Sequence, residues 1–130
     1  MGFVEHLNCC AEQCAAIAEV VDRNFLGRIP IDRDVLIAGA LLADIGKLFE
    51  YELDDHGAPC VGERGRLLRH PFIGVSLCER HGLPDEVAHI VATHSHEGDL
   101  MQRSVEAIIF HHADFIDFDI ARLLDRGARP

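Results

Sequence analysis

The feature that most constrains the fold is an uninterrupted apolar run from Val35 to Ala43, which is followed at once by Asp44. A run of Val, Leu, Ile, Ala and Gly of this length predicts a helix that is buried on all sides. A carboxylate at the end of such a helix is costly unless a cation or several hydrogen-bond donors meet it. This segment alone leaves two interpretations open. Either Asp44 leaves the core as the helix ends at Gly46, or it binds a metal ion.

Helical periodicity runs through most of the rest of the chain. Apolar residues recur every three or four positions over residues 2–25, Pro30 then breaks the pattern, and Asp32 can cap a second helix that runs to about Gly46. Residues 48–66 have no helical period and predict a loop or a short hairpin around Asp55-His56-Gly57. Further helices are expected from Pro71 to Gly82, from Pro84 onward, over about 103–118, and over 120–126. We therefore predict an all-α bundle of five or six helices, in a single domain over residues 1–130.

Composition excludes several classes of protein. A net charge of -10 argues against nucleic-acid binding, which needs a basic face. No apolar stretch is long enough to cross a membrane, and no secretory signal is evident. The odd count of five cysteines then predicts reduced thiols in a cytoplasm. Cys9, Cys10 and Cys14 share the first helix, and we expect small core residues there rather than a thiolate metal site.

Histidines and aspartates on different helices are the candidate metal ligands. Any one of them alone is more often a satisfied core or surface group. Together they combine imidazole and carboxylate ligands, a mixture that suits Mn, Fe, Co, Ni or Zn, and a carboxylate can bridge two ions. Helix bundles commonly build such sites in the core from facing helices. The five candidates are His6, Asp44, His70, His94 and Asp114.

Five short segments carry these residues in a characteristic order. They are Glu5-His6-Leu7, Ala40 to Lys47, Arg69-His70-Pro71-Phe72-Ile73-Gly74, Gly82 to Ala88 leading to Thr93-His94, and His112-Ala113-Asp114. In this order they resemble the HD-domain superfamily of metal-dependent phosphohydrolases, and the resemblance covers nearly the whole chain. It implies a helical HD-domain bundle with one or two divalent transition-metal ions.

The resemblance also implies a role for each ligand. Asp44 would bridge two ions, the first bound also by His6 and Asp114, and the second by His70 and His94. This chain departs from the family at Ala43, which stands where the family has the histidine of its His-Asp pair. Alanine cannot bind a metal, so either water fills the gap or the first ion position is weak or empty. We expect the missing ligand to reduce the activity or to abolish it.

The function that the resemblance implies is hydrolysis of a small phosphoester or nucleotide-like substrate by metal-activated water. Asp44 and Lys47 would be catalytic, with Lys47 in contact with the anionic substrate, as its place in the family motif implies. A lysine at a helix C-terminus that complements the helix dipole explains Lys47 equally well. Two alternatives remain: an HD-type di-iron oxygenase, and a non-catalytic module that binds a ligand.

Three further residues are candidates for substrate binding. Arg66 and Arg69 lie in a basic run ahead of His70, and guanidinium groups suit phosphate. A solvated loop with ion pairs to the protein's own acids is the simpler interpretation of that run. His96 is expected either at the mouth of the site or on the surface. His111, three residues before Asp114, is a candidate supporting donor rather than a ligand.

Overall fold

Helices account for most of the computed structural model, and the predicted all-α fold is confirmed. The structure describes residues 2–127, and side chains as far as residue 124, so both ends of the expected 1–130 domain lie outside the described residues. None of the described helices is long and apolar enough to cross a membrane. The elements are α1 (Phe3–Asn24), α2 (Arg33–Leu42), α3 (Lys47–Glu50), β1 (Tyr51–Leu53), β2 (Pro59–Val61), α4 (Glu63–Leu67), α5 (His70–Arg80), α6 (Asp85–Thr93), the 3-10 helix η1 (His96–Gly98) and α7 (Val105–Gly127).

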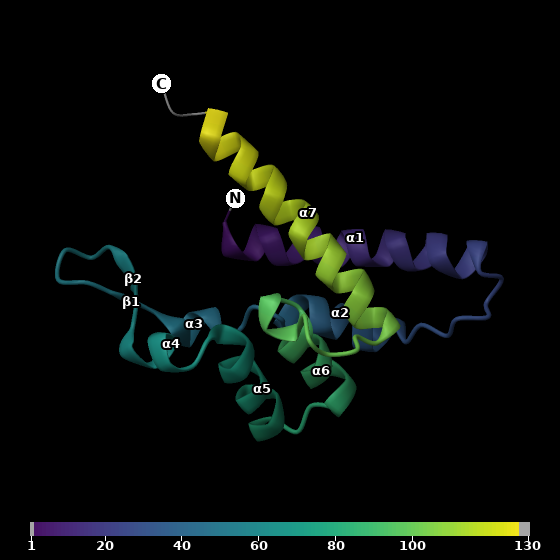
Figure 1. Ribbon diagram of the computed structural model, residues 1–130, viewed down its shortest axis with the longest axis horizontal. Helices are drawn as coiled ribbons and strands as arrows, with labels where there is room; N and C mark the ends of the chain where they lie inside the picture. The colour runs from purple at the N-terminus through teal and green to yellow at the C-terminus, as the bar shows by residue number, and fades with distance from the viewer. Residues whose placement is uncertain (1, 128–130) are drawn as a thin grey trace.

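The core lies where α1, α2, α6 and α7 meet (Figure 1). The apolar run of α2 supplies Leu36 and Ala40 to this core, and it contacts α1, α6 and α7. A Cβ atom on Gly39 would lie 2.4 Å from the Cδ1 atom of Ile90, so the glycine allows α2 and α6 to approach closely. Cys10 and Cys14 are fully buried in the same core, as expected for small apolar residues.

The start of α2 follows the prediction, but its end does not. The Asp32 side chain accepts a hydrogen bond from the Val35 amide at 3.0 Å, which confirms the expected cap. The helix stops at Leu42 rather than near Gly46, and residues 43–46 form turns before α3. A Cβ atom on Gly46 would lie 2.1 Å from the His70 carbonyl oxygen. The turn is therefore packed against the start of α5, which places Asp44 beside His70.

The 48–66 segment contains the expected short hairpin, which projects from one end of the molecule (Figure 1). Its strands pair Tyr51 with Val61 and Leu53 with Pro59. In the turn, the Asp54 carboxylate accepts hydrogen bonds from two backbone amides, at 2.8 Å each. The one-turn helices α3 and α4 that flank the hairpin were not expected, because a single turn is too short to produce a helical period.

The C-terminal part of the chain corrects the prediction of separate fifth and sixth helices. α7 is one continuous helix over Val105–Gly127. No glycine or proline occurs between these end residues, so nothing in the sequence interrupts the helix at residue 119. Because α7 is continuous, it crosses α1 and extends beyond the core (Figure 1).

Candidate metal centre

Five side chains from five separate segments converge between the helices. Three of them, Asp44, His70 and His94, are almost fully buried, with 2%, 6% and 1% of their surface exposed. The other two are partly open to solvent. The structure thus brings together all five residues predicted as ligands, although their role as ligands stays a prediction. They are His6 on α1, Asp44 in the turn after α2, His70 at the start of α5, His94 just after α6, and Asp114 in the middle of α7.

The buried half of the cluster is a triangle of three ligand atoms. The Nε2 atoms of His70 and His94 are 3.1 Å apart, and each lies 3.5 Å from Oδ1 of Asp44. Ligand atoms that share one transition-metal ion at about 2.0–2.2 Å lie roughly 3.0–3.5 Å from one another. The three atoms can therefore bind one ion without rearrangement, and an ion with only three protein ligands keeps positions for water or substrate.

The hydrogen bonds of the two histidines show why this triangle suits a cation. Nδ1 of His70 faces the Glu50 carboxylate at 2.6 Å, and Nδ1 of His94 faces the Val91 carbonyl oxygen at 2.8 Å. Both partners only accept, so Nδ1 carries the proton in each ring and Nε2 of each neutral ring has a free lone pair. Two lone pairs and a carboxylate oxygen then face one another in a buried space. These groups repel one another unless a cation lies between them. The residues present therefore fit a bound metal ion.

The second half of the cluster lies on the other oxygen of Asp44. Oδ2 of Asp44 is 3.3 Å from Nε2 of His6, which is 3.1 Å from Oδ1 of Asp114. The two oxygens of Asp44 thus face two different sets of partners, the geometry of a bridging carboxylate. Lys47 contacts the same Oδ2 atom through its ammonium group at 2.7 Å.

Ala43 is fully buried and belongs to the core around α2. The position that the family pattern gives to a histidine is therefore filled here by close packing. Among the described residues, the second half of the cluster has candidate ligand atoms from three, His6, Asp44 and Asp114. An imidazole at this position must displace packed neighbours.

The pKa values in the cluster follow from these contacts. Burial alone would raise the pKa of Asp44, but the hydrogen bond from His6 and the charge of Lys47 outweigh it and hold that pKa well below its usual range. Hydrogen bonds to two carboxylates raise the pKa of His6 far above its usual value. The bond to Asp114 has the largest effect, and the bond to Asp44 has the next largest. Burial, and then the neighbouring His94, lower the pKa of His70. A lowered pKa favours the neutral imidazole, the form that binds metals.

Glu50 supports the buried triangle, and sequence analysis missed it. Its carboxylate is 3% exposed and accepts hydrogen bonds from Nδ1 of His70 at 2.6 Å, from the His70 backbone amide at 3.2 Å and from Nε of Arg69 at 2.9 Å. A carboxylate behind a metal-binding histidine fixes the orientation of its ring. No sequence signal pointed to Glu50, because it lies in the segment that has no helical period.

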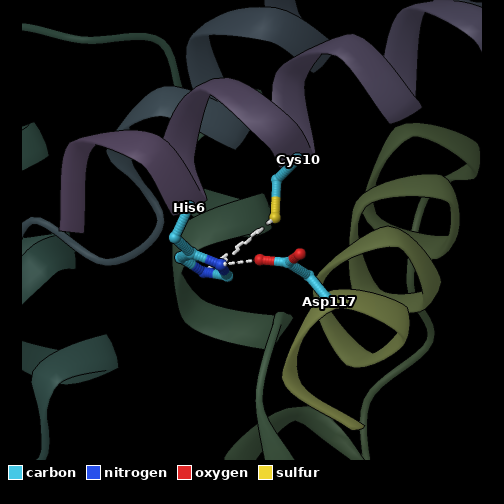
Figure 2. Close-up of side chains that lie close together, drawn as sticks. All are labelled: His6, Cys10 and Asp117. Atoms are coloured by element: carbon cyan, nitrogen blue, oxygen red, sulfur yellow. Dashed lines mark hydrogen bonds and ion pairs between the residues drawn. The ribbon is translucent and has the colours of Figure 1, made fainter. Parts of the chain in front are cut away.

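Asp117 plays the corresponding role behind His6 (Figure 2). Its Oδ2 atom accepts a hydrogen bond from Nδ1 of His6 at 2.5 Å. The three-residue spacing from Asp114 places both carboxylates on one face of α7, and this spacing was a signal in the sequence. His111 also supports the cluster, because its Nδ1 atom lies 2.6 Å from the carbonyl oxygen of His94. This contact reaches the backbone of His94 rather than the expected Asp114.

Cys10 lies beside His6 and Asp117, and the three could be taken for a further metal site (Figure 2). Its sulfur is 3.7 Å from Nδ1 and 3.9 Å from Nε2 of the same ring. These two nitrogens point in different directions, so similar distances to both place the sulfur against the ring rather than along either lone pair. Burial also raises the pKa of the Cys10 thiol, which disfavours the thiolate that would bind a metal. Cys10 therefore packs against the imidazole.

A cavity of about 260 Å³ opens onto the cluster. It is lined by the five candidate ligands and by three of the four residues expected to contact substrate, namely Lys47, Arg69 and His96. The fourth, Arg66, is exposed on α4 and does not belong to this lining, so its contact with substrate stays a prediction.

Comparison with known proteins gives a consistent result. A family model described as HD domain matches residues 3–119. A dihydroneopterin 2',3'-cyclic phosphate phosphodiesterase of Methanocaldococcus jannaschii is 33% identical over 122 residues, which are 92% of this chain and 47% of that protein. Ribonuclease Y proteins of Acidothermus cellulolyticus and Desulforamulus reducens are 31% and 33% identical over 86 residues, which are 66% of this chain and 14% of each relative. No solved structure gives a significant match.

This chain belongs to the HD-domain family, which confirms the predicted resemblance. The match to the family model includes all five converging residues. The chain spans about half the length of the phosphodiesterase and a smaller part of each ribonuclease Y.

Proposed function

We propose that this chain is a metal-dependent hydrolase that cleaves a phosphodiester of a small molecule with an activated water molecule. The observation that carries the proposal is the buried triangle of Asp44, His70 and His94, in which three lone-pair atoms face one another at 3.1–3.5 Å. A divalent ion held by these three residues would supply a Lewis acid for the phosphoryl oxygen and would activate water as the nucleophile near neutral pH.

The chain's own residues would bind and orient the phosphate. Lys47 lines the cavity, and its ammonium group sits 2.7 Å from Asp44, beside the candidate metal ligands. An ammonium at this place can donate to a phosphoryl oxygen and stabilise the negative charge that develops during hydrolysis. Arg69 lines the same cavity, and its Nε atom contacts the buried Glu50 carboxylate at 2.9 Å, which orients its guanidinium group.

The small volume of the cavity and the negative net charge of the protein favour a small substrate over RNA. The cavity of about 260 Å³ is close to the lower end of the range for small-molecule sites. The net charge of -10 repels a polyanion such as RNA. Among the relatives, the phosphodiesterase that acts on a cyclic phosphate covers 92% of the chain. Its similarity supports phosphodiester hydrolysis over the di-iron oxygenase alternative.

The test is metal reconstitution with a defined set of substrates. Protein stripped with a chelator should be inactive, and Mn, Co, Ni, Fe or Zn should restore hydrolysis of bis-p-nitrophenyl phosphate and of a small cyclic phosphodiester. The p-nitrophenyl monoester measures the competing monoesterase activity. Asp44→Asn should remove metal and turnover together, whereas Asp34→Asn, an equal change at an exposed position of α2, should keep both. Stoichiometric metal binding without turnover of any ester would refute the hydrolase and favour the ligand-binding module.

A further inference from the structure

The cavity over the metal centre has two chemically different parts. Its floor consists of the buried ligand cluster and Lys47. Its rim includes the aromatic side chains of Tyr51, Phe115 and Phe118 and the imidazole of His96. Tyr51 and Phe118 are about half exposed, at 48% and 52%. A phosphoester bound at the floor would therefore extend past aromatic rings as it leaves the site.

Exposure alone does not single out these rings, because α7 exposes other apolar residues. Ile116 and Ile120 on the same helix are 48% and 54% exposed, and neither belongs to the cavity lining. Phe118 differs from them because it faces the site. Tyr51 lines the same cavity from β1, a separate element of the fold. Aromatic rings from two elements therefore border one opening above the candidate metal centre.

The rings on α7 are held in place by their neighbours. Phe115 packs edge-on against His96, with ring centroids 5.3 Å apart, and against Phe118 at 6.5 Å. The guanidinium of Arg122 lies 5.5 Å from the centroid of the Phe118 ring. These contacts restrain Phe118 before a ligand arrives, so stacking on it costs less conformational entropy.

We propose that Tyr51 and Phe118 form a subsite that binds a planar heteroaromatic ring, and that the preferred substrate is a phosphodiester carrying such a ring. The inference rests on the proposed function, since the phosphate would lie at Lys47 and the metal centre. Ring stacking needs no specific hydrogen bonds, so the subsite would accept several heterocycles of similar size. Tyr51 and Phe118 are then specificity residues and take no part in bond cleavage.

One test uses the single tyrosine of the chain as a reporter. The sequence contains one tyrosine and no tryptophan, so its intrinsic fluorescence reports Tyr51 alone. Adenosine 2'-phosphate, a monoester with a purine ring, should change this emission saturably in the zinc-loaded protein. Glycerol 2-phosphate, which has no ring, should leave it unchanged at the same concentrations. A parallel titration of free tyrosine amide corrects for absorption by the purine. Equal responses to both ligands would overturn the subsite.

The second test compares variants on two cyclic diesters. Wild type should prefer adenosine 2',3'-cyclic phosphate to glycerol 1,2-cyclic phosphate in kcat/KM. Phe118→Leu keeps an apolar side chain but removes the ring, and should lower kcat/KM for the adenosine ester about 5- to 30-fold. The glycerol ester should be unaffected. Ile116→Leu, at an equally exposed position outside the cavity, should change neither value.

The outcomes separate this inference from the proposed function. Equal hydrolysis of both esters by wild type would refute the ring subsite and leave the hydrolase intact. An equal loss on both esters in Phe118→Leu would show a structural role for Phe118 and also refute the subsite. If neither ester is hydrolysed, the proposed function fails for these diesters, and the fluorescence titration still decides whether a ring binds beside Tyr51.

Discussion

Replacement of Glu50 by glutamine should weaken metal binding although Glu50 is not a predicted ligand. Glutamine has nearly the same shape but no charge. In the structure the Glu50 carboxylate accepts three hydrogen bonds, from Nδ1 and the backbone amide of His70 and from Nε of Arg69. The amide group of glutamine offers one accepting oxygen, and its NH₂ group would face one of these donors. His70 then loses the partner that fixes its orientation.

The size of this effect can be worked out from the contacts. Loss of a carboxylate behind a metal-binding histidine typically lowers metal affinity about 10- to 100-fold, which corresponds to roughly 1.4–2.7 kcal/mol. The buried charge-assisted hydrogen bonds to His70 contribute about 1.5–3 kcal/mol each to stability. Glutamine keeps part of this contribution. We therefore expect the free energy of unfolding to fall by about 1–3 kcal/mol. The ion pair with Arg69 adds little, because the arginine side chain is 55% exposed.

The assay is isothermal titration of chelator-treated protein with Zn or Mn, together with a melting curve of the same sample. Glu52→Gln is the matched control, because it makes the same chemical change at an exposed strand position two residues along the chain. Glu50→Gln should raise the metal Kd at least tenfold and lower Tm by several degrees, and Glu52→Gln should do neither. A folded Glu50→Gln protein whose metal Kd stays within twofold of wild type would refute the positioning role.

Three further predictions follow from the cluster. Asp44→Asn should remove bound metal while the helical circular dichroism stays intact, and full metal occupancy by elemental analysis would contradict the bridging role. Ala43→His should lower the free energy of unfolding by about 1–3 kcal/mol, because residue 43 is fully buried. If elemental analysis of the same sample shows a rise toward two ions per chain, the new histidine has supplied the missing ligand beside His6 and Asp114. Metal-free protein should lose stability as the pH falls below 3.8, the pKa of Asp44 in the unfolded chain. The folded protein holds this pKa lower, so acid protonates the unfolded chain first and favours unfolding. Melting curves in a chelator should show a smaller acid loss in Asp44→Asn than in wild type.

The predicted ligands were found in the sequence because each lies at a recognisable place in a helical pattern. Asp44 ends an apolar run, His70 precedes Pro71, and Asp114 interrupts an apolar helix face. Polar side chains at such places are costly without partners, so local sequence identifies them as candidates. The supporting carboxylates are different. Glu50 lies in a one-turn helix without a period, and its contact with His70 depends on how the chain folds back over twenty residues.

The sequence by itself determined the helical class of the fold, the hairpin, and the residues that could bind a metal, because these depend on short-range periodicity, turn residues and side-chain chemistry. Only the tertiary structure decided which nitrogen of each histidine faces the centre, and which oxygen of Asp44 faces which partners. It also decided that Ala43 is buried in the core and that Lys47, Arg69 and His96 line the same cavity as the candidate ligands. These features depend on the packing of segments that are distant in the chain, and no local pattern encodes that packing.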